Sequence, residues 1–254
     1  MMILMVVLVY SCSEEETISD SVHGRMVQDD TNPISTMKID QDVIANNGIG
    51  HSCLDEAVVG SGSCILNTFS GAIALPQYPG CSFWIYAEYY VCTSNGSGQA
   101  IYFIDFEVLE HDCPQFNQDI INANNSNTLD QFTAHFNASV WKVLTYSLIS
   151  GSPPNVSQIG FEYYSAACEK TCYVIVTKKG FTGYVPIDYP CSEYCCKVRR
   201  NFSFSSTTNQ WEQTDVFYNV DNNNPCWSDT PPQNCPPNTV FTIDCRSNCE
   251  SLLW

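Results

Sequence analysis

Basic residues are scarce in this chain of 254 residues. Lysine and arginine together number 10, against 27 aspartates and glutamates, which gives a formal net charge of −17. Binding to nucleic acid or to a bare anionic membrane depends on cationic side chains, so this balance argues against both. We expect no nucleic-acid partner. Charged residues make up only 15% of the chain, so uncharged polar side chains must cover much of its surface.

Familiar catalytic and metal-binding motifs are also missing. No serine lies in a G-x-S-x-G pattern and no H-E-x-x-H pattern occurs. Three cysteine pairs have a four-residue step, whereas zinc ribbons more often use a three-residue step. These pairs are Cys168/Cys172, Cys191/Cys195 and Cys245/Cys249. We read them as structural disulfides, and we expect neither a metal ion nor another cofactor.

Cysteine, by contrast, is abundant. The chain has 15 cysteines, and all but the first lie in residues 53–249. An even set of cysteines in an exported protein indicates a disulfide framework. We therefore expect every cysteine after the first to form a disulfide. They are Cys53, Cys64, Cys81, Cys92, Cys113, Cys168, Cys172, Cys191, Cys195, Cys196, Cys226, Cys235, Cys245 and Cys249.

The remaining cysteine, Cys12, follows an apolar N-terminal run. Residues 1–10 have the length of a signal-peptide core and are far too short to span a bilayer. Val9-Tyr10-Ser11-Cys12 resembles the lipobox at which bacterial lipoproteins are cleaved and acylated, and the acidic run Ser13-Glu14-Glu15-Glu16 resembles the start of the tether in Bacteroidota surface lipoproteins. The resemblance implies a lipid on Cys12 and anchoring at the outer membrane or cell surface. The alternative is an ordinary signal peptide and a soluble secreted protein.

Three regions follow from this interpretation. Residues 1–11 would be the signal peptide. Residues 12–50 would be a flexible acidic tether, because residues 13–50 contain no aromatic side chain and cannot bury enough apolar surface to offset chain entropy. Residues 51–254 would form a single disulfide-stapled domain, because cysteines occur through both halves of this segment.

The folded part is predicted to be mainly β, an antiparallel sheet or sandwich with one long helix packed on it. Runs rich in β-branched and aromatic residues predict the strands, and the glycine-rich turn at 95–98 joins the first two as a hairpin. These runs are residues 83–91, 100–109, 159–164, 173–178, 193–204 and 240–243.

One segment has the apolar spacing of a helix. Apolar residues recur at steps of three and four from Leu129 to Leu148, which predicts a helix over residues 129–149. Thr128 and Gln131 fit a capping box at its start, and Gly151 would end it.

Strand geometry also constrains the disulfides. Cys81 and Cys92 bracket a predicted strand, so they lie too far apart to pair with each other and each needs another partner. Cys53 and Cys64 flank a glycine-serine turn and are predicted to pair across it. The adjacent Cys195 and Cys196 point to opposite faces of a strand, so we expect them to have different partners.

Glu110, His111 and Asp112 form the strongest cluster of titratable residues. They lie at a predicted strand end, where histidine and carboxylates often perform acid–base catalysis. A solvated turn before Cys113 is the competing interpretation and the one we favour, because no nucleophile or metal motif accompanies them. They are weak catalytic candidates, and the sequence identifies no catalytic residue with a supporting partner.

Two further features suggest binding. Six of the ten basic residues fall within positions 170–200, and they include a possible binding patch for an anionic glycan or protein. That patch consists of Lys178, Lys179, Lys197, Arg199 and Arg200. Tryptophans at 84, 211 and 227 could serve as aromatic platforms for a glycan.

The sequence therefore favours a lipid-anchored surface protein with a non-catalytic role in binding, adhesion or envelope assembly. Its partner, a protein or a glycan, is not identified by the sequence. Two alternatives remain: a secreted hydrolase that uses carboxylate or histidine chemistry near Glu110-His111-Asp112, and a glycan-binding module with exposed aromatics.

Overall fold

A computed structural model describes residues 64–93, 98–151, 156–166, 168–178, 181–191, 195–220, 234–247, 249–252 and 254. The expected signal peptide, tether and Cys12 lie outside these residues. Nine strands, two helices and a short 3-10 helix are described. In chain order they are β1 (Cys64–Ile73), β2 (Phe83–Thr93), β3 (Gly98–His111), α4 (Pro114–Asn125), α5 (Leu129–Ser150), β4 (Gln158–Ala166), β5 (Cys168–Lys178), β6 (Phe181–Pro190), β7 (Cys195–Ser205), β8 (Gln210–Val220), β9 (Thr239–Ser247) and η1 (Cys249–Leu252).

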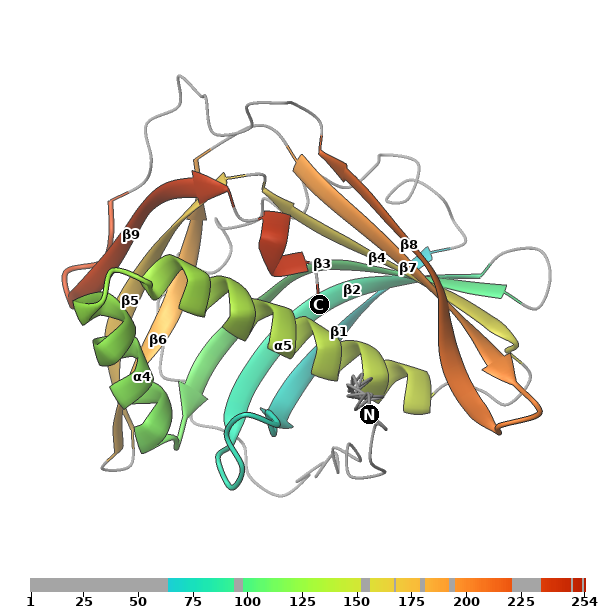
Figure 1. The fold of residues 1–254 in the computed structure, drawn as a ribbon, viewed down its shortest axis with the longest axis horizontal. Coiled ribbons are helices and arrows are strands. Elements are labelled where there is room, and N and C mark those ends of the chain that lie inside the picture. The colour runs from blue at the N-terminus through green and yellow to red at the C-terminus, as the bar shows by residue number, and fades with distance from the viewer. Residues whose placement is uncertain are drawn as a thin grey trace, which may run out of the picture.

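The strands form two sheets (Figure 1). The larger has the order β1-β2-β3-β4-β7-β8, and the smaller has the order β6-β5-β9. The mainly β class with a disulfide framework and a long helix on a sheet is confirmed. Neighbouring strands pair antiparallel except β3 and β4, which are parallel; the two helices between them in the chain supply the long crossover connection that a parallel pair needs.

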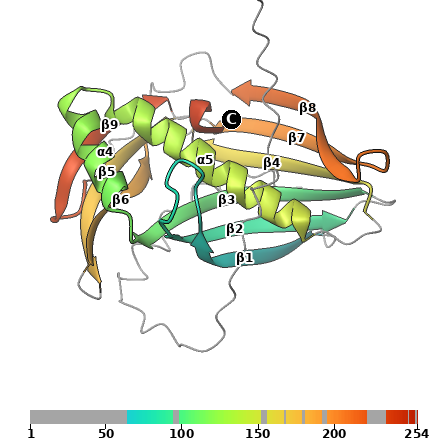
Figure 2. The ribbon, with the colours of Figure 1, turned by 60° about the horizontal axis from the view of Figure 1, so that its bottom comes forward.

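The long helix α5 lies across both sheets (Figures 1 and 2). It occupies Leu129–Ser150, so the predicted range of 129–149 is confirmed, as is its end at Gly151. The prediction of a capping box at its start is wrong. No side-chain hydrogen bond caps the helix start, and the Thr128 hydroxyl instead donates to the carbonyl of Ala123 in α4, at 3.5 Å.

Buried tyrosines attach α5 to each sheet. The hydroxyl of Tyr173, on β5, lies 2.7 Å from Thr133 Oγ1, and that of Tyr163, on β4, lies 2.5 Å from Thr145 Oγ1. Each threonine hydroxyl also donates 2.7 Å to a helix carbonyl four residues earlier. Because this uses the threonine's single proton, each tyrosine is the donor in its pair. Both buried phenols are therefore satisfied, and the helix has a polar contact with both sheets.

Aromatic side chains fill the space between α5 and the larger sheet. Trp141, 4% exposed, contacts Phe103, Phe106 and Tyr163, with ring centroids 5.2, 4.8 and 5.6 Å away. Phe83 and its alternate neighbours on β2 are also fully buried on this side. The same hydrophobic cluster includes Tyr173 and Val185 of the smaller sheet.

The second helix, α4, was not predicted. It buries Phe116, Ile120 and Ala123. Its Asn117 side chain donates to the Thr182 carbonyl at 3.2 Å and accepts from the Tyr184 N–H at 2.9 Å, so α4 is bonded to the backbone of β6. Among the described residues, no helix is both long and apolar enough to cross a membrane.

Five disulfides can be assigned to their partners among the residues that the structure describes. They are Cys64–Cys92, Cys81–Cys113, Cys172–Cys235, Cys191–Cys245 and Cys196–Cys249. Cys168 and Cys195 are also disulfide-bonded, while Cys53 and Cys226 lie outside the described residues. These disulfides indicate an exported protein that matures in an oxidising compartment.

The pairing tests three expectations. Cys81 and Cys92 have separate partners, as predicted. The predicted Cys53–Cys64 bridge is wrong, because Cys64 pairs with Cys92 directly across the β1–β2 ladder. Cys196 pairs with Cys249, so the disulfide of Cys195 is to another cysteine, as its opposite direction on the strand requires.

Candidate functional site

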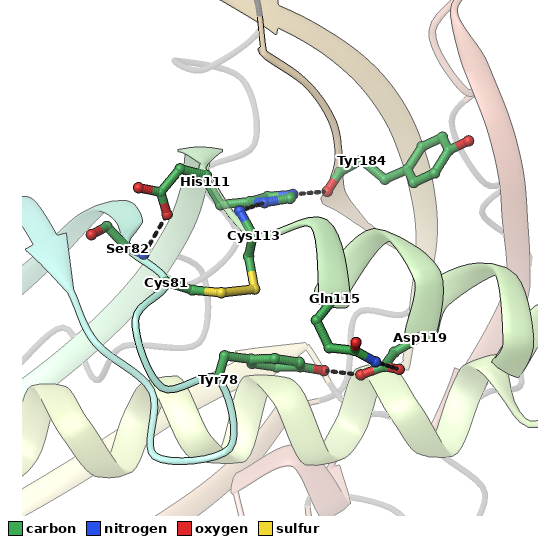
Figure 3. Close-up of a disulfide and its surroundings, with 9 residues drawn as sticks. Tyr78, Cys81, Ser82, His111, Cys113, Gln115, Asp119 and Tyr184 are labelled. Carbon is green, nitrogen blue, oxygen red and sulfur yellow. Dashed lines mark hydrogen bonds between the residues drawn. A yellow bond between two sulfur atoms is a disulfide. The ribbon is translucent and has the colours of Figure 1, made fainter.

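The Glu110-His111-Asp112 segment lies at the end of β3, where His111 and Asp112 are bonded to backbone groups; Figure 3 shows the surroundings of His111. His111 is 4% exposed; its Nε2 lies 2.9 Å from the Tyr184 carbonyl and its Nδ1 accepts from the Cys113 N–H at 3.1 Å. These contacts define the neutral tautomer with the proton on Nε2, and burial lowers the histidine pKa. The imidazole is thus held between β6 and the disulfide-bonded Cys113.

The two carboxylates beside His111 do not converge on it. Asp112 accepts the N–H of Ser82 at 2.6 Å, next to the Cys81–Cys113 disulfide (Figure 3). Glu110 is in register with Trp84, whereas His111 is in register with the buried Phe83, so their side chains lie on opposite faces of the sheet. The three residues are not brought together as an acid–base group.

The face of the larger sheet that points away from α5, the outer face, carries a different set of side chains. On β2, Phe83, Ile85 and Ala87 are buried on the α5 side, so the alternating Trp84 and Tyr86 lie on the outer face. Register across the sheet defines a cross-sheet row on that face. From β1 to β8 it consists of Leu66, Tyr90, Tyr102, Glu162, Arg199 and Phe217.

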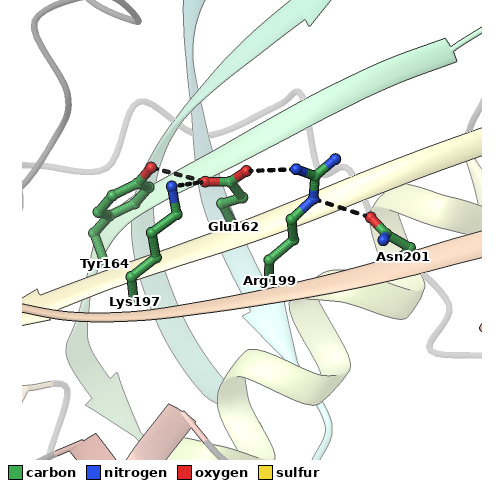
Figure 4. A network of polar contacts seen from close by, with 5 residues as sticks. All are labelled: Glu162, Tyr164, Lys197, Arg199 and Asn201. Carbon is green, nitrogen blue, oxygen red and sulfur yellow. Dashed lines mark hydrogen bonds and ion pairs between the residues drawn. The ribbon is translucent and has the colours of Figure 1, made fainter. Parts of the chain in front are cut away.

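Glu162 is the centre of this row (Figure 4). Its carboxylate lies 2.6 Å from Lys197 Nζ and 3.6 Å from a terminal nitrogen of Arg199, and it accepts the Tyr164 hydroxyl at 2.8 Å. The glutamate is buried, whereas the side chains of Lys197 and Arg199 are 42% and 50% exposed. The network therefore fixes two partly exposed cations around one buried anion.

Further contacts hold these cations in place. Arg199 Nε donates to Asn201 Oδ1 at 3.1 Å, which orients the guanidinium, and its side chain covers Gly160. Lys197 Nζ also lies 5.2 Å from the centre of the Tyr164 ring, and the rings of Tyr164 and Tyr102 are 6.4 Å apart. Cationic donors and aromatic rings thus stand side by side in a fixed arrangement.

The basic residues predicted as one patch are distributed over several places. Arg199 belongs to the cross-sheet row, and Lys197 lies beside it as the second cation of the Glu162 network. Arg200 points the other way, is 2% exposed, and stacks its guanidinium 4.0 Å from the centre of the Trp254 ring. Lys178 ends β5 in the smaller sheet, and Lys179 lies outside the described residues.

The predicted tryptophan platforms differ in setting. Trp84 is half-buried on the outer face, while Trp211 is half-buried at the start of β8 and packs on Phe204, with ring centroids 5.6 Å apart. Trp227 lies outside the described residues. The tyrosines at 90 and 102 were not among the sequence candidates, although alternation within their strands was a usable signal.

Acidic residues occupy the neighbouring part of the outer face. Glu88 and Glu107 lie on adjacent strands, and the Tyr86 hydroxyl donates to Glu88 Oε1 at 2.6 Å. Burial, together with the negative charge of Glu88, raises the pKa of Glu107 to about 7. Glu107 therefore titrates near neutral pH. No group of three or more histidine, cysteine or acidic side chains in the described part of the chain could hold a metal ion.

The raised pKa of Glu107 has a consequence for stability. Because the folded pKa exceeds the ordinary value of 4.5, the associated stabilisation is present below pH 4.5 and is lost as the pH rises through about 7. We expect Glu107→Gln to raise the free energy of unfolding near pH 8 by about 1–2 kcal/mol, an amount reduced for partial exposure. Near pH 4 the gain should disappear.

Urea unfolding of both proteins between about pH 4 and pH 8 measures this effect. The exposed Asp244→Asn on β9 is the control for removing a carboxylate, and it should not reproduce the gain in stability near pH 8. His111 has the opposite effect on the pH dependence of stability, because the stability that comes from its lowered pKa is lost as the pH falls below 6.5. Wild type and both variants contain His111, so its contribution cancels in the comparison. Parallel curves for wild type and Glu107→Gln would contradict the assignment.

Comparison with known proteins identifies no relative: no protein family, curated protein or solved structure matches the chain.

Proposed function

We propose that this protein is a lipid-anchored, cell-surface binding protein whose ligand site is the outer face of the larger sheet. The supporting observation is the Glu162 network, in which Lys197 and Arg199 are partly exposed and fixed by ion pairs and hydrogen bonds. Positioning cationic donors in advance lowers the entropy cost of binding. The bonding of His111 and Asp112 to backbone groups favours binding over catalysis at that segment.

A glycan is the ligand class that suits this face best. Sugars combine hydroxyl-rich edges with apolar ring faces, and the cross-sheet row offers charged hydrogen-bond partners beside aromatic rings. Arg199 can form charged hydrogen bonds with hydroxyl or carboxylate oxygens, and Tyr102 and Tyr90 supply aromatic surface. Acidic sugars should be preferred near Lys197 and Arg199.

Anchoring is a separate part of the proposal. It rests on the lipobox-like Val9-Tyr10-Ser11-Cys12 and on the disulfides that indicate export. Acylated Cys12 would hold the protein at the outer membrane, with residues 13–50 as a spacer.

An array of immobilised neutral and acidic oligosaccharides tests the binding site. We expect wild type to bind a subset, and Arg199→Ala to weaken binding tenfold or more, because a lost charged hydrogen bond costs about 1.5–3 kcal/mol. Tyr102→Ala should weaken the same interactions.

The matched control is Lys142→Ala, which removes an exposed cation from α5, on the other side of the sheet. It should bind like wild type. Absence of binding to every oligosaccharide, or undiminished binding by a folded Arg199→Ala protein, would refute a glycan site on this face.

A hydrolase is the second candidate, and one observation favours it. The pKa of Glu107, raised to about 7 beside Glu88, is the property expected of a general acid in glycoside hydrolysis. Any glycan that binds should therefore be checked for cleavage. Product formation by wild type that is lost in Glu107→Gln would replace the binding proposal with a hydrolase, at Glu107 rather than Glu110.

A further inference from the structure

The last strand of the larger sheet, β8, has an exposed edge. In the part of the chain that the structure describes, β7 is the only strand paired with it. Residues 212–219 are all exposed, and at their centre Val216, Phe217 and Tyr218 are 44%, 57% and 48% exposed. An edge strand with three consecutive exposed apolar residues is prone to associate with another strand.

Natural edge strands are usually protected from pairing. Lysine, proline, a bulge or a very short strand are the common means. β8 has 11 residues with no lysine and no proline. The irregularity opposite Asn201 and Phe202 affects only its first half, around Thr214. The segment from Asp215 to Val220 therefore keeps a regular register and contains none of these protective features within the described strand.

We propose that β8 pairs antiparallel with β8 of a second copy of this protein, with Phe217 at the two-fold axis. In this register Phe217 faces Phe217 of the second copy, and Val216 faces its Tyr218. Cross-strand pairs of aromatic and β-branched residues are the favourable contacts of antiparallel sheets. The two larger sheets would become one continuous sheet, with their outer faces on the same side.

Charge agrees with this register. On a chain of net charge −17, self-association must avoid opposing carboxylates. The two-fold axis at Phe217 places Asp215 opposite Asn219 of the second copy, so no acid faces an acid, and Glu212 falls beyond the regular part of the pairing. A two-fold contact also closes on itself, whereas β8 pairing with β1 would continue into a fibre.

Mass measurement by light scattering during gel filtration tests the pairing over a range of concentrations. A single strand pair buries little surface, so the expected species are monomer and dimer in a concentration-dependent equilibrium. We expect Phe217→Lys to be monomeric throughout. The control is Ile65→Lys on β1, the opposite edge, where Ile65 is 69% exposed; it should still dimerise.

A charge exchange tests the register itself. Asn219→Asp places an aspartate beside Lys197 within the monomer but opposite Asp215 of the second copy. It should keep monomer stability and shift dissociation to at least tenfold higher concentration. Adding Asp215→Asn leaves one carboxylate in each opposed pair and should restore dimerisation. A monomeric wild type, loss of assembly in Ile65→Lys, or no rescue by the double variant would overturn the proposal.

Discussion

Replacing Trp141 by alanine is expected to lower the free energy of unfolding by about 3–5 kcal/mol. The indole projects from α5 toward the larger sheet and is buried there among Phe103, Phe106 and Tyr163. Its removal leaves a cavity that rings fixed on strands cannot readily fill. Because native domains are stable by only about 5–15 kcal/mol, such a loss consumes much of the total.

Urea denaturation followed by tryptophan-independent far-UV circular dichroism measures this loss. Gln131→Ala is the matched control, because Gln131 is exposed on the same helix and alanine is a good helix former. It should change the free energy of unfolding by less than about 0.5 kcal/mol. A Trp141→Ala protein as stable as this control would show that α5 is not packed as described.

Removal of the Cys196–Cys249 disulfide is expected to cost about 4 kcal/mol. The bridge has a sequence separation of 53 and fastens η1 to the fully buried Cys196 on β7, so its loss frees a long loop in the unfolded chain. Cys196→Ala combined with Cys249→Ala removes both sulfurs and leaves no unpaired thiol. Thermal unfolding of the purified double variant should show a clear fall in midpoint.

The comparison bridge is Cys64–Cys92, with a sequence separation of 28 between an edge strand and its neighbour. The corresponding double alanine variant should lose less stability, because its loop is shorter and Cys64 is partly exposed. A larger loss at Cys64–Cys92 than at Cys196–Cys249 would show that loop closure does not govern the contribution of these bridges.

Periodicity predicted the elements with regular burial. The three- and four-residue apolar steps identified α5, because that helix packs one face on the sheets over its whole length. The strands β2 and β3 were identified from their β-branched and aromatic content. The shorter α4 was missed because it is rich in asparagine, although Phe116, Ile120 and Ala123 follow helical spacing.

A strand that is exposed on both faces has no periodic pattern from which it could be predicted. β8 has no alternation of apolar and polar residues because both of its faces are exposed, so nothing in the pattern distinguishes it from a loop. The candidate site was beyond prediction for another reason. Tyr102, Glu162 and Arg199 are brought together only by the registers of β3, β4 and β7. One of these registers is that of the parallel pair β3 and β4, which are separated in the chain by two helices. The sequence supplied Arg199 and Lys197 as candidates but not Tyr102 or Glu162.

The weak catalytic candidates at the end of β3 show that adjacency in sequence does not bring side chains together on a strand. Glu110 and His111 are neighbours along β3, and strand alternation sends them to opposite faces. Arg199 and Arg200 are separated in the same way: one lies on the outer face and the other is buried against Trp254. Residues two apart, such as Glu162 and Tyr164, are the ones that act together on a strand.

Intact mass spectrometry of the native protein, extracted from membranes and alkylated without reduction, tests the central claim most directly. The claim is an exported protein that is anchored through Cys12 and held by disulfides. The account predicts a chain that begins at an acylated Cys12 and carries no alkyl label on any later cysteine. A soluble chain that begins beyond Cys12, or alkyl groups on several cysteines from Cys53 onward, would contradict it.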